Sequence, residues 1–358
     1  MLLIKPALVE AVRDASVAAD LYPLVQSAIE LEHSTIPPYL TALYSIKQGH
    51  NLAAAQIIGS VVGEEMLHMA IAGNLLNAIG GSPAIDDPLF IPAYPGPLPM
   101  GVGGSLTVGL EKLSRRLAHD VFMSIEEPEA PLDIPVGLPP GVQLLATTSV
   151  PPPAPEYATI GEFYAAIKQK LVEFGPGVIT GDPARQVVDA RWFPETELFP
   201  ILTLDDALRG IDIIVEQGEG TPHSPLDEEG QLSHYYRFAE LVYGRRLIAV
   251  PVEPGWSYAG EPIPLDPAGI WNLCPDAKAA DYPENSQARV LADAFNASYT
   301  RLLGCLHQVF NGEPDRLSMA LSLMVEMHLT AQKLVATPVP GTDLFAAPTF
   351  EYNAGDGG

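Results

Sequence analysis

Two stretches near the start of the chain decide its fold: residues 30–40, ELEHSTIPPYL, and residues 64–68, EEMLH. Each lies in a longer segment, 17–48 or 51–80, whose apolar residues recur at helical spacing. The turn Gly49-His50-Asn51 joins the two segments, and Gly80-Gly81 ends the second as glycine commonly ends helices. The sequence therefore predicts an antiparallel hairpin of two long helices.

Three ionisable residues fall within the apolar faces of these helices: Glu32 in the first, and Glu65 and His68 in the second. A carboxylate facing a core costs several kcal/mol unless it is paired or bound to a metal. Glu32 lies about 18 residues before the turn and Glu65 about 15 after it, so at roughly 1.5 Å per residue they reach nearly the same height. A Glu facing a Glu-x-x-His motif is half of a carboxylate-bridged di-metal site in a four-helix bundle. The alternative is a buried ion pair of His68 with a carboxylate, and helical phase places Glu30, His33 and Glu64 on a solvated face.

The second half of such a site is less clearly marked. In residues 231–238, QLSHYYRF, Gln231 and His234 share a face, so a neutral Gln stands where a symmetric site has Glu. Glu216, on an expected helix at 203–218, is the obvious carboxylate. It shares its phase with charged residues, however, so periodicity fits a solvated side chain as well as a ligand.

The rest of the chain is divided by proline- and glycine-rich segments, of which 128–155 is the longest and reads as a crossover. A capping-box pattern, Thr159 with Glu162, marks the start of a helix that reaches about residue 174. A hairpin is expected near 248–252 and a tail at 341–358. Further helices are expected at 106–127, 231–243, 285–311 and 314–335.

Composition narrows the classes of function. The 358 residues carry 19 Lys+Arg against 44 Asp+Glu, a net charge of −25, which repels nucleic acid. No run approaches about 18 apolar residues, so no transmembrane helix is expected, and the N-terminus lacks a signal-peptide pattern. Two cysteines are too few for a disulfide framework. We therefore expect a cytoplasmic protein that does not bind membranes or nucleic acid and can form homo-oligomers.

The motifs resemble those of the ferritin-like domain of iminophenyl-pyruvate dimer synthases, a family of secondary metabolism. The segments that carry the resemblance are 30–40, 64–68, 74–81 (NLLNAIGG), 94–99 (YPGPLP), 160–164 (IGEFY), 216–220 (EQGEG), 234–238 (HYYRF) and 346–351 (AAPTFE). The resemblance implies a mainly α protein: a ferritin-like four-helix bundle at 1–245 with Pro/Gly-rich crossovers, extended by C-terminal helices at 246–358.

The resemblance also implies an iron site and adds Glu216 and His234 as metal ligands to Glu32, Glu65 and His68. The expected function is an iron-dependent oxidoreductase that uses dioxygen or peroxide on a small organic substrate, an amino-acid-derived imine or keto acid, by coupling or dehydrogenation. Gln231 leaves open whether one or two irons bind. Iron storage, or non-catalytic binding with a degenerate metal site, are the alternatives.

Overall fold

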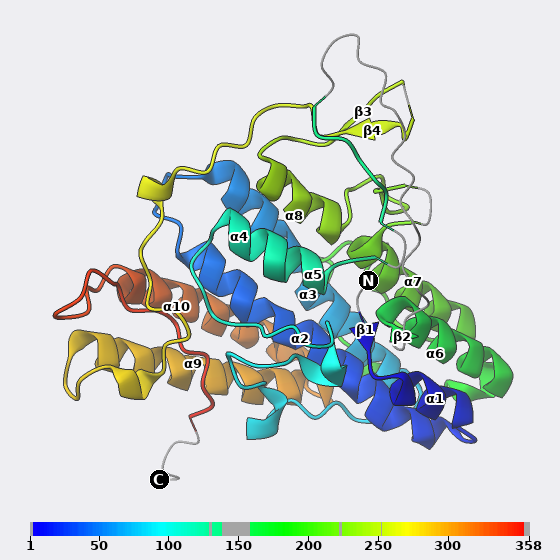
Figure 1. The fold of residues 1–358 in the computed structure, drawn as a ribbon. Coiled ribbons are helices and arrows are strands. Elements are labelled where there is room, and N and C mark those ends of the chain that lie inside the picture. Colours follow the sequence, from blue (N-terminus) through cyan, green and yellow to red (C-terminus); the bar gives the residue numbers. More distant parts are fainter. Residues whose placement is uncertain (1–2, 129–130, 138–157, 222–223, 252, 354–358) are drawn as a thin grey trace.

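The computed structural model describes residues 3–128, 131–137, 158–221, 224–251 and 253–353. The expected hairpin is present: α2 (Tyr22–Tyr44) and α3 (Leu52–Ala78) pack antiparallel through the centre of the molecule (Figure 1). Pro37 and Pro38 lie inside α2, where their missing N–H groups free two carbonyls. One of these, that of Ser34, accepts a hydrogen bond of 2.6 Å from the Tyr94 hydroxyl, so the prolines do not leave it unpaired.

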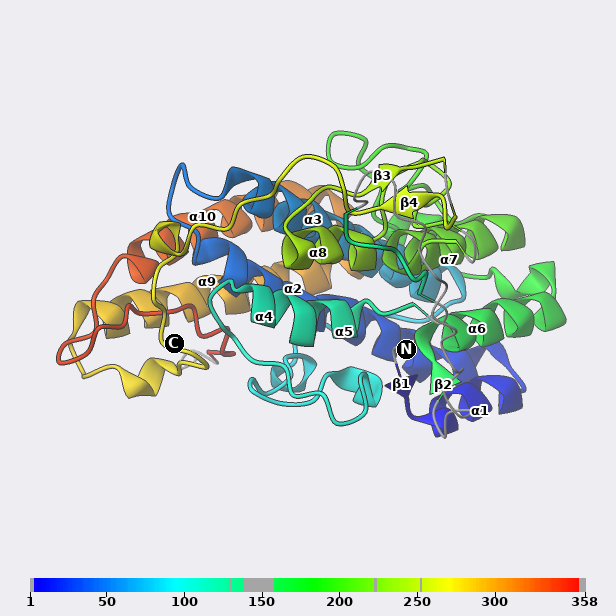
Figure 2. The ribbon, with the colours of Figure 1, turned by 45° about the horizontal axis from the view of Figure 1, so that its top comes forward.

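Two further bundle positions are each filled by a pair of short helices. On one side, α4 (Arg115–Leu117), a π-turn (Ala118–Phe122) and α5 (Met123–Ile125) are followed in line by α6 (Ile160–Phe174). On the other side, α8 (His234–Tyr243) and α7 (Leu204–Glu219) lie along α3. Figure 2 shows both pairs beside the central hairpin. The result is a ferritin-like bundle whose third and fourth helices are broken.

Local sequence explains where these helices begin. The Thr159 hydroxyl accepts from the N–H of Glu162 and the Glu162 carboxylate accepts from the N–H of Thr159, which confirms the expected capping box of α6. A helix over 106–127 was expected, but it begins only at Arg115, after the N-cap Ser114. In the same way α8 begins at His234, so Gln231 lies before the helix and not on its inner face.

The C-terminal helices α9 (Gln287–Phe310) and α10 (Leu317–Val335) pack on the other face of the hairpin, α10 against α2 and α9 against α3. Because both faces of the hairpin are covered, α2 and α3 are buried nearly all round. The segment expected as a tail also packs inward: Ala346, Thr349 and Phe350 are buried. A domain boundary near residue 245 stays a prediction.

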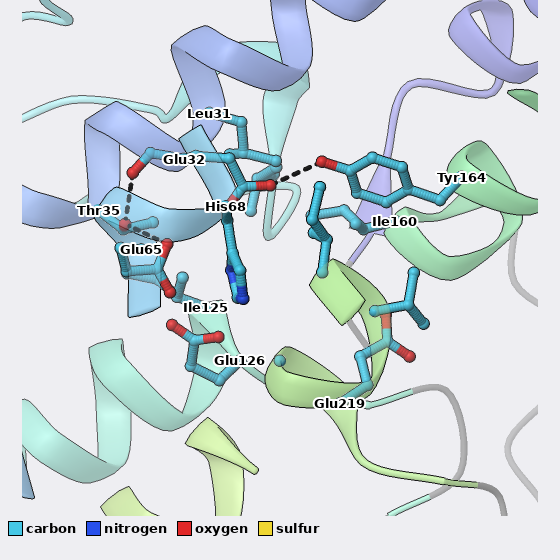
Figure 3. A pocket seen from close by; sticks show the side chains of 14 residues that line it. Leu31, Glu32, Thr35, Glu65, His68, Ile125, Glu126, Ile160, Tyr164 and Glu219 are labelled. Carbon is cyan, nitrogen blue, oxygen red and sulfur yellow. Dashed lines mark hydrogen bonds and ion pairs between the residues drawn. The ribbon is translucent and has the colours of Figure 1, made fainter. Parts of the chain in front are cut away.

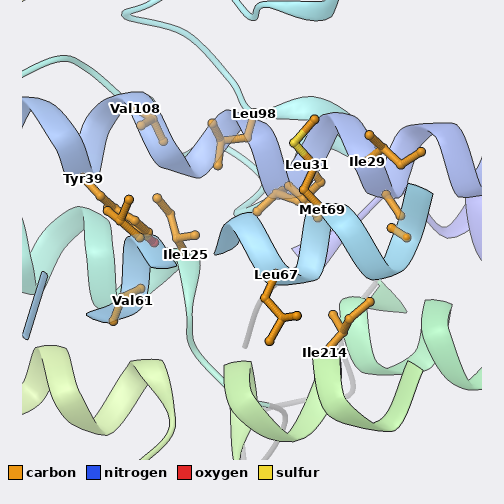
Figure 4. Packing of buried hydrophobic residues seen from close by; sticks show 14 of the residues in the cluster. Ile29, Leu31, Tyr39, Val61, Leu67, Met69, Leu98, Val108, Ile125 and Ile214 are labelled. Carbon is orange, nitrogen blue, oxygen red and sulfur yellow. The ribbon is translucent and has the colours of Figure 1, made fainter. Parts of the chain in front are cut away.

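The core lies between the hairpin and its neighbours. Figure 4 shows Leu67 of α3 directed at Ile214 of α7, and Tyr39 of α2 near Ile125 of α5. Full burial of such side chains contributes roughly 1.5–3 kcal/mol each. Tyr39, Phe122 and Phe238 pack with ring centroids 4.7 to 5.1 Å apart, which ties α2 to the π-turn and to α8.

The remaining elements are small. Helix α1 (Pro6–Asp14) packs on α6, strand β1 (Leu3–Ile4) pairs with β2 (Ala158–Thr159), and the expected hairpin is formed by β3 (Ile248–Ala249) with β4 (Trp256–Ser257). No helix in the described ranges is long and apolar enough to cross a membrane. Single 3-10 turns lie at Ala18–Leu21, Pro88–Phe90, Pro99–Gly101, Pro176–Val178, Pro183–Arg185, Pro267–Gly269, Ala279–Asp281 and Pro314–Arg316.

Candidate metal centre

Five buried ionisable side chains meet in the middle of the bundle. Glu32 comes from α2, Glu65 and His68 from α3, Glu126 from the residue that ends α5, and His234 from the first residue of α8. They form two groups, Glu32–Glu65–His68 and Glu65–Glu126–His234, and within each group the ligand atoms lie within 4.8 Å of one another. Glu65 is common to both groups, so the two sets of three share one carboxylate. Figure 3 shows Glu65 with Glu32, His68 and Glu126.

The nitrogen atoms that face the carboxylates are both Nδ1. Nδ1 of His68 lies 3.6 Å from Oε2 of Glu32. Nδ1 of His234 lies 2.9 Å from Oε1 of Glu65 and 3.4 Å from Oε2 of Glu126. The two imidazole rings stack with their centroids 5.4 Å apart, and none of the five side chains belongs to a residue more than 8% exposed.

Each of the three carboxylates accepts one hydroxyl hydrogen bond. The Tyr164 hydroxyl of α6 donates to Oε1 of Glu32 over 2.7 Å, and the Thr35 hydroxyl donates to Oε2 of Glu65 over 2.9 Å (Figure 3). The Tyr39 hydroxyl donates to Glu126. These bonds fix the orientation of each carboxylate and leave its other oxygen free to face the cluster.

Each histidine is held through its outer nitrogen. Nε2 of His68 donates to Oε1 of Gln217 over 2.9 Å, and Nε2 of His234 donates to Oε2 of Glu64 over 3.0 Å. A carboxylate can only accept, so Glu64 places the proton of a neutral His234 on Nε2 and leaves a lone pair on Nδ1. That buried Nδ1 has no hydrogen bond of acceptable geometry to the described residues. This is the arrangement in which metal-ligating histidines are usually held.

The electrostatics favour positive charge among the carboxylates. Against the effect of burial, the charges and hydrogen bonds of Glu126, Glu64 and Glu65 raise the pKa of His234 well above its ordinary value. Burial, with the nearby charge of Glu126, raises the pKa of Glu65 to about 7. Burial alone would raise the pKa of Glu64 too, but His234 and Arg237, the latter 2.7 Å away, lower it to about 2. Cations between the three inner carboxylates remove the repulsion that burial strengthens. Three carboxylates and two imidazoles are a donor set suited to iron, so the residues fit a pair of metal ions.

A cavity of about 50 Å³ is lined by Glu32, Glu65, His68 and Glu126 of the cluster, with further residues of α2, α5, α6 and α7. Its walls are mostly apolar, including Ile125, Ile160 and Ile214. A volume of this size holds a few water-sized molecules. The cavity therefore lies directly beside the carboxylates.

The structure brings together four of the five residues proposed from the sequence: Glu32, Glu65, His68 and His234. Glu216 does not join them. It lies partly exposed on α7 beside Asp212 and Glu228, and it is the next residue, Gln217, that faces the cluster.

Further expectations from helical phase are also corrected. Gln231 is exposed, whereas His33 is buried and Glu64, expected on a solvated face, binds both His234 and Arg237. Glu126 was missed. The signal that could have found it is a carboxylate at the end of the third helical block, directly before the Pro-rich crossover that begins at Pro128.

A broken four-helix bundle with a shared-carboxylate cluster at its centre defines a ferritin-like protein. The ferritin-like family model matches residues 25–243, and the chain belongs to that family.

Among curated proteins, the chain is 29% identical over 328 residues to dichlorochromopyrrolate synthase of Lentzea aerocolonigenes, a match that covers 82% of this chain and 30% of the relative. The chain thus spans less than a third of that relative's length. The crystal structure of a ferritin-like protein from Caulobacter vibrioides matches with a TM-score of 0.57 and 24% identity, covering 89% of this chain and 96% of that one. At this identity the likeness shows the fold alone.

Proposed function

We propose that the protein is an iron-dependent oxidoreductase that holds two iron ions at the central cluster and oxidises a small organic molecule with dioxygen or peroxide. The observation that carries the proposal is the sharing of Glu65 between two ligand groups, each with an imidazole that presents Nδ1 inward. Resemblance to a protein named as a synthase supports an enzyme. Because the chain corresponds to only part of that relative, the substrate is proposed by class, as an amino-acid-derived imine or keto acid.

The assignment of ligands follows the two groups. Glu32 and His68 would hold one ion, Glu126 and His234 would hold the other, and Glu65 would be shared between them. Iron in such a set supplies the change of oxidation state needed to reduce dioxygen or peroxide. Coupling two substrate molecules forms one C–C bond and releases two protons and two electrons, which the oxidant accepts.

The protein's own groups orient the ligands and line the adjoining cavity. Burial raises the pKa values of Tyr39 and Tyr164 well above 10, so both phenols stay protonated and continue to donate to their carboxylates. Glu64 and Gln217 keep the outer nitrogens of the histidines as donors. Ile125, Ile160 and Ile214 give the cavity an apolar wall beside the carboxylates.

The size of the cavity separates the two reactants. About 50 Å³ admits dioxygen but not an amino-acid-derived molecule. We place the organic substrate at the mouth of this cavity, between α6 and α7, where Ile160, Val215 and Gly218 form part of the lining.

The test uses the full chain loaded anaerobically with ferrous iron and then mixed with dioxygen and a probe, indole-3-pyruvate or phenylpyruvate with ammonium. We expect probe-dependent dioxygen uptake and a product whose mass is two monomers less two hydrogens, or one monomer less two hydrogens. Both signals should vanish in Glu65→Ala and persist in Glu216→Ala, which changes a carboxylate outside the cluster.

Other outcomes identify the alternatives. Uptake of many irons per chain in a hollow assembly, without probe-dependent dioxygen uptake, would replace the proposal with iron storage. A wild-type chain that binds no iron would indicate a non-catalytic protein with a degenerate site.

A further inference from the structure

The small cavity beside the carboxylates has one wall that does not come from a helix of the bundle. Its described lining residues lie on α2, α3, α5, α6 and α7 or, for Glu126, directly after α5, with the single exception of Val102. Val102 directly follows the turn Pro99–Gly101, and its side chain is fully buried. A helix wall can move only together with its ladder of hydrogen bonds, so Val102 is the described part of the lining that is displaced most easily.

The loop that carries Val102 is fixed at its base and loosely held at its tip. Gly96 and Val108 exchange two backbone hydrogen bonds of 3.0 and 2.8 Å, which close the base of the loop at 97–107. Within the loop, the backbone bonds to described residues are local, apart from one of 3.2 Å from the N–H of Lys5 to the carbonyl of Met100. The tip can therefore move while the base stays paired.

Glycines stand on both sides of Val102. Gly101 and Gly103 have φ values of 73° and 75°, in the left-handed region that glycine adopts without steric cost. Because glycine has the widest choice of other backbone conformations, these two positions can absorb a change in the direction of the chain. Met100 also has a positive φ, of 61°, which is unfavourable for a residue with a Cβ atom, so movement of the tip relieves a strained position.

We propose that Val102 is the gate residue of the metal centre: the tip of the loop at 97–107 swings on its base and withdraws Val102 from the cavity when the organic substrate enters. With Val102 in place, the cavity of about 50 Å³ admits a molecule of the size of dioxygen, and the organic substrate stays at the mouth. With Val102 withdrawn, the reacting part of the substrate reaches the carboxylates. This inference rests on the proposed function, since it names the residue that selects molecules by size at the same site.

The first experiment follows opening of the loop in the metal-free full chain. Val102→Cys and Val108→Cys form a matched pair, because both valines are fully buried but Val108 belongs to the paired base. We expect N-ethylmaleimide to modify the thiol at position 102 at least about tenfold faster than the thiol at position 108, since only the tip opens. Peptide mass spectrometry measures both rates, with the buried Cys305 of α9 as an internal reference. Equal rates at the two positions, or protection of both, would overturn the gate.

The second experiment uses the iron-loaded chain and two oxidants of the same chemistry but different size, hydrogen peroxide and tert-butyl hydroperoxide. Each takes one electron from each of two ferrous ions and, with two protons, gives water and either a second water or tert-butanol. Val102→Ala removes two methyl groups from the cavity wall, so we expect the rate with tert-butyl hydroperoxide, relative to that with hydrogen peroxide, to rise by about tenfold in stopped-flow absorbance. Val108→Ala shortens a buried valine outside the described lining and should keep the wild-type ratio.

The outcomes distinguish failure of the gate from failure of the proposed function. A ratio that is unchanged in Val102→Ala, or raised equally in Val108→Ala, would overturn the selection by Val102. A wild-type chain that binds no iron would overturn the proposed function, and the labelling rates of the metal-free chain would still decide whether the loop opens. Far-UV circular dichroism and thermal melts check that each variant is folded.

Discussion

Replacing Glu126 with alanine distinguishes the two halves of the metal cluster, because Glu126 belongs to only one of the two ligand groups. The change leaves the second group with Glu65 and His234 and leaves the first group, Glu32–Glu65–His68, complete. We expect the iron content to fall from two ions per chain to one. Glu65→Ala removes a ligand from both groups, so its content should fall to nearly zero.

The size of the expected effect sets the conditions of the assay. Changing a residue that only supports a ligand costs about ten- to hundredfold in metal affinity, so deleting a ligand costs at least that much. At free iron about tenfold above the wild-type dissociation constants, an intact position is about nine-tenths filled, and a position weakened a hundredfold is only about one-tenth filled. Elemental analysis after dialysis at that concentration counts the ions.

Glu216→Ala is the matched control, because it removes a partly exposed carboxylate that lies away from the cluster. It should keep two ions per chain. Retention of both ions by a folded Glu126→Ala variant would refute the assignment of Glu126. Loss of one ion in Glu216→Ala would favour the ligand set expected from the sequence.

Three further predictions concern the surroundings of the cluster. In metal-free protein, the pKa of Glu65 is about 7 in the folded chain but about 4.5 in the unfolded chain, so the stability that its proton contributes is present below pH 4.5 and is lost as the pH rises through 7. In urea unfolding, the wild type should lose up to about 3 kcal/mol relative to Glu65→Gln across this pH window. Parallel curves of stability against pH for the two proteins would contradict the raised pKa. Glu64→Gln removes the charge that orients His234. In calorimetric titrations with iron, we expect one ion to bind about ten- to hundredfold more weakly and the other to bind unchanged. Equal weakening of the two ions would show a general structural effect. Thr159→Ala removes the capping box of α6 and should cost about 1 kcal/mol in urea unfolding, whereas an unchanged midpoint would mean that packing alone sets the start of that helix.

The hairpin and the convergence of Glu32, Glu65 and His68 could be predicted because α2 and α3 are continuous and their periodicity is unbroken. Within such helices a fixed rotation per residue determines which side chains share a face, and a short turn fixes the relative height of Glu32 and Glu65. Helical phase by itself grouped Glu216 with charged residues and so allowed a solvated position. The structure places Glu216 in such a partly exposed position. The family resemblance favoured Glu216 over this phase argument, and the structure places Gln217 toward the cluster instead.

The other errors come from long-range packing and from helix ends. His33 and Glu64 were expected in solvent because helical phase assumes one exposed face, but α9 and α10 cover the back of the hairpin and the side chain of Arg237 reaches Glu64. Glu126 ends a helix that contains a π-turn, so no regular repeat marks its direction. Gln231 was expected on a helix that begins three residues later, and boundaries of this kind are the least predictable feature of a sequence.

The broken third and fourth helices give the two metal positions unequal mechanical support. Glu32, Glu65 and His68 lie in the interior of continuous helices of 23 and 27 residues, whose hydrogen bonds, apart from those missing at Pro37 and Pro38, hold them in place. Glu126 directly follows the last residue of α5 and His234 is the first residue of α8, and local opening at helix ends costs the least free energy. The first group therefore has the more rigid support. If the cluster holds two ions as proposed, we expect the first to bind at Glu32, Glu65 and His68 and the second to bind after it at Glu126 and His234.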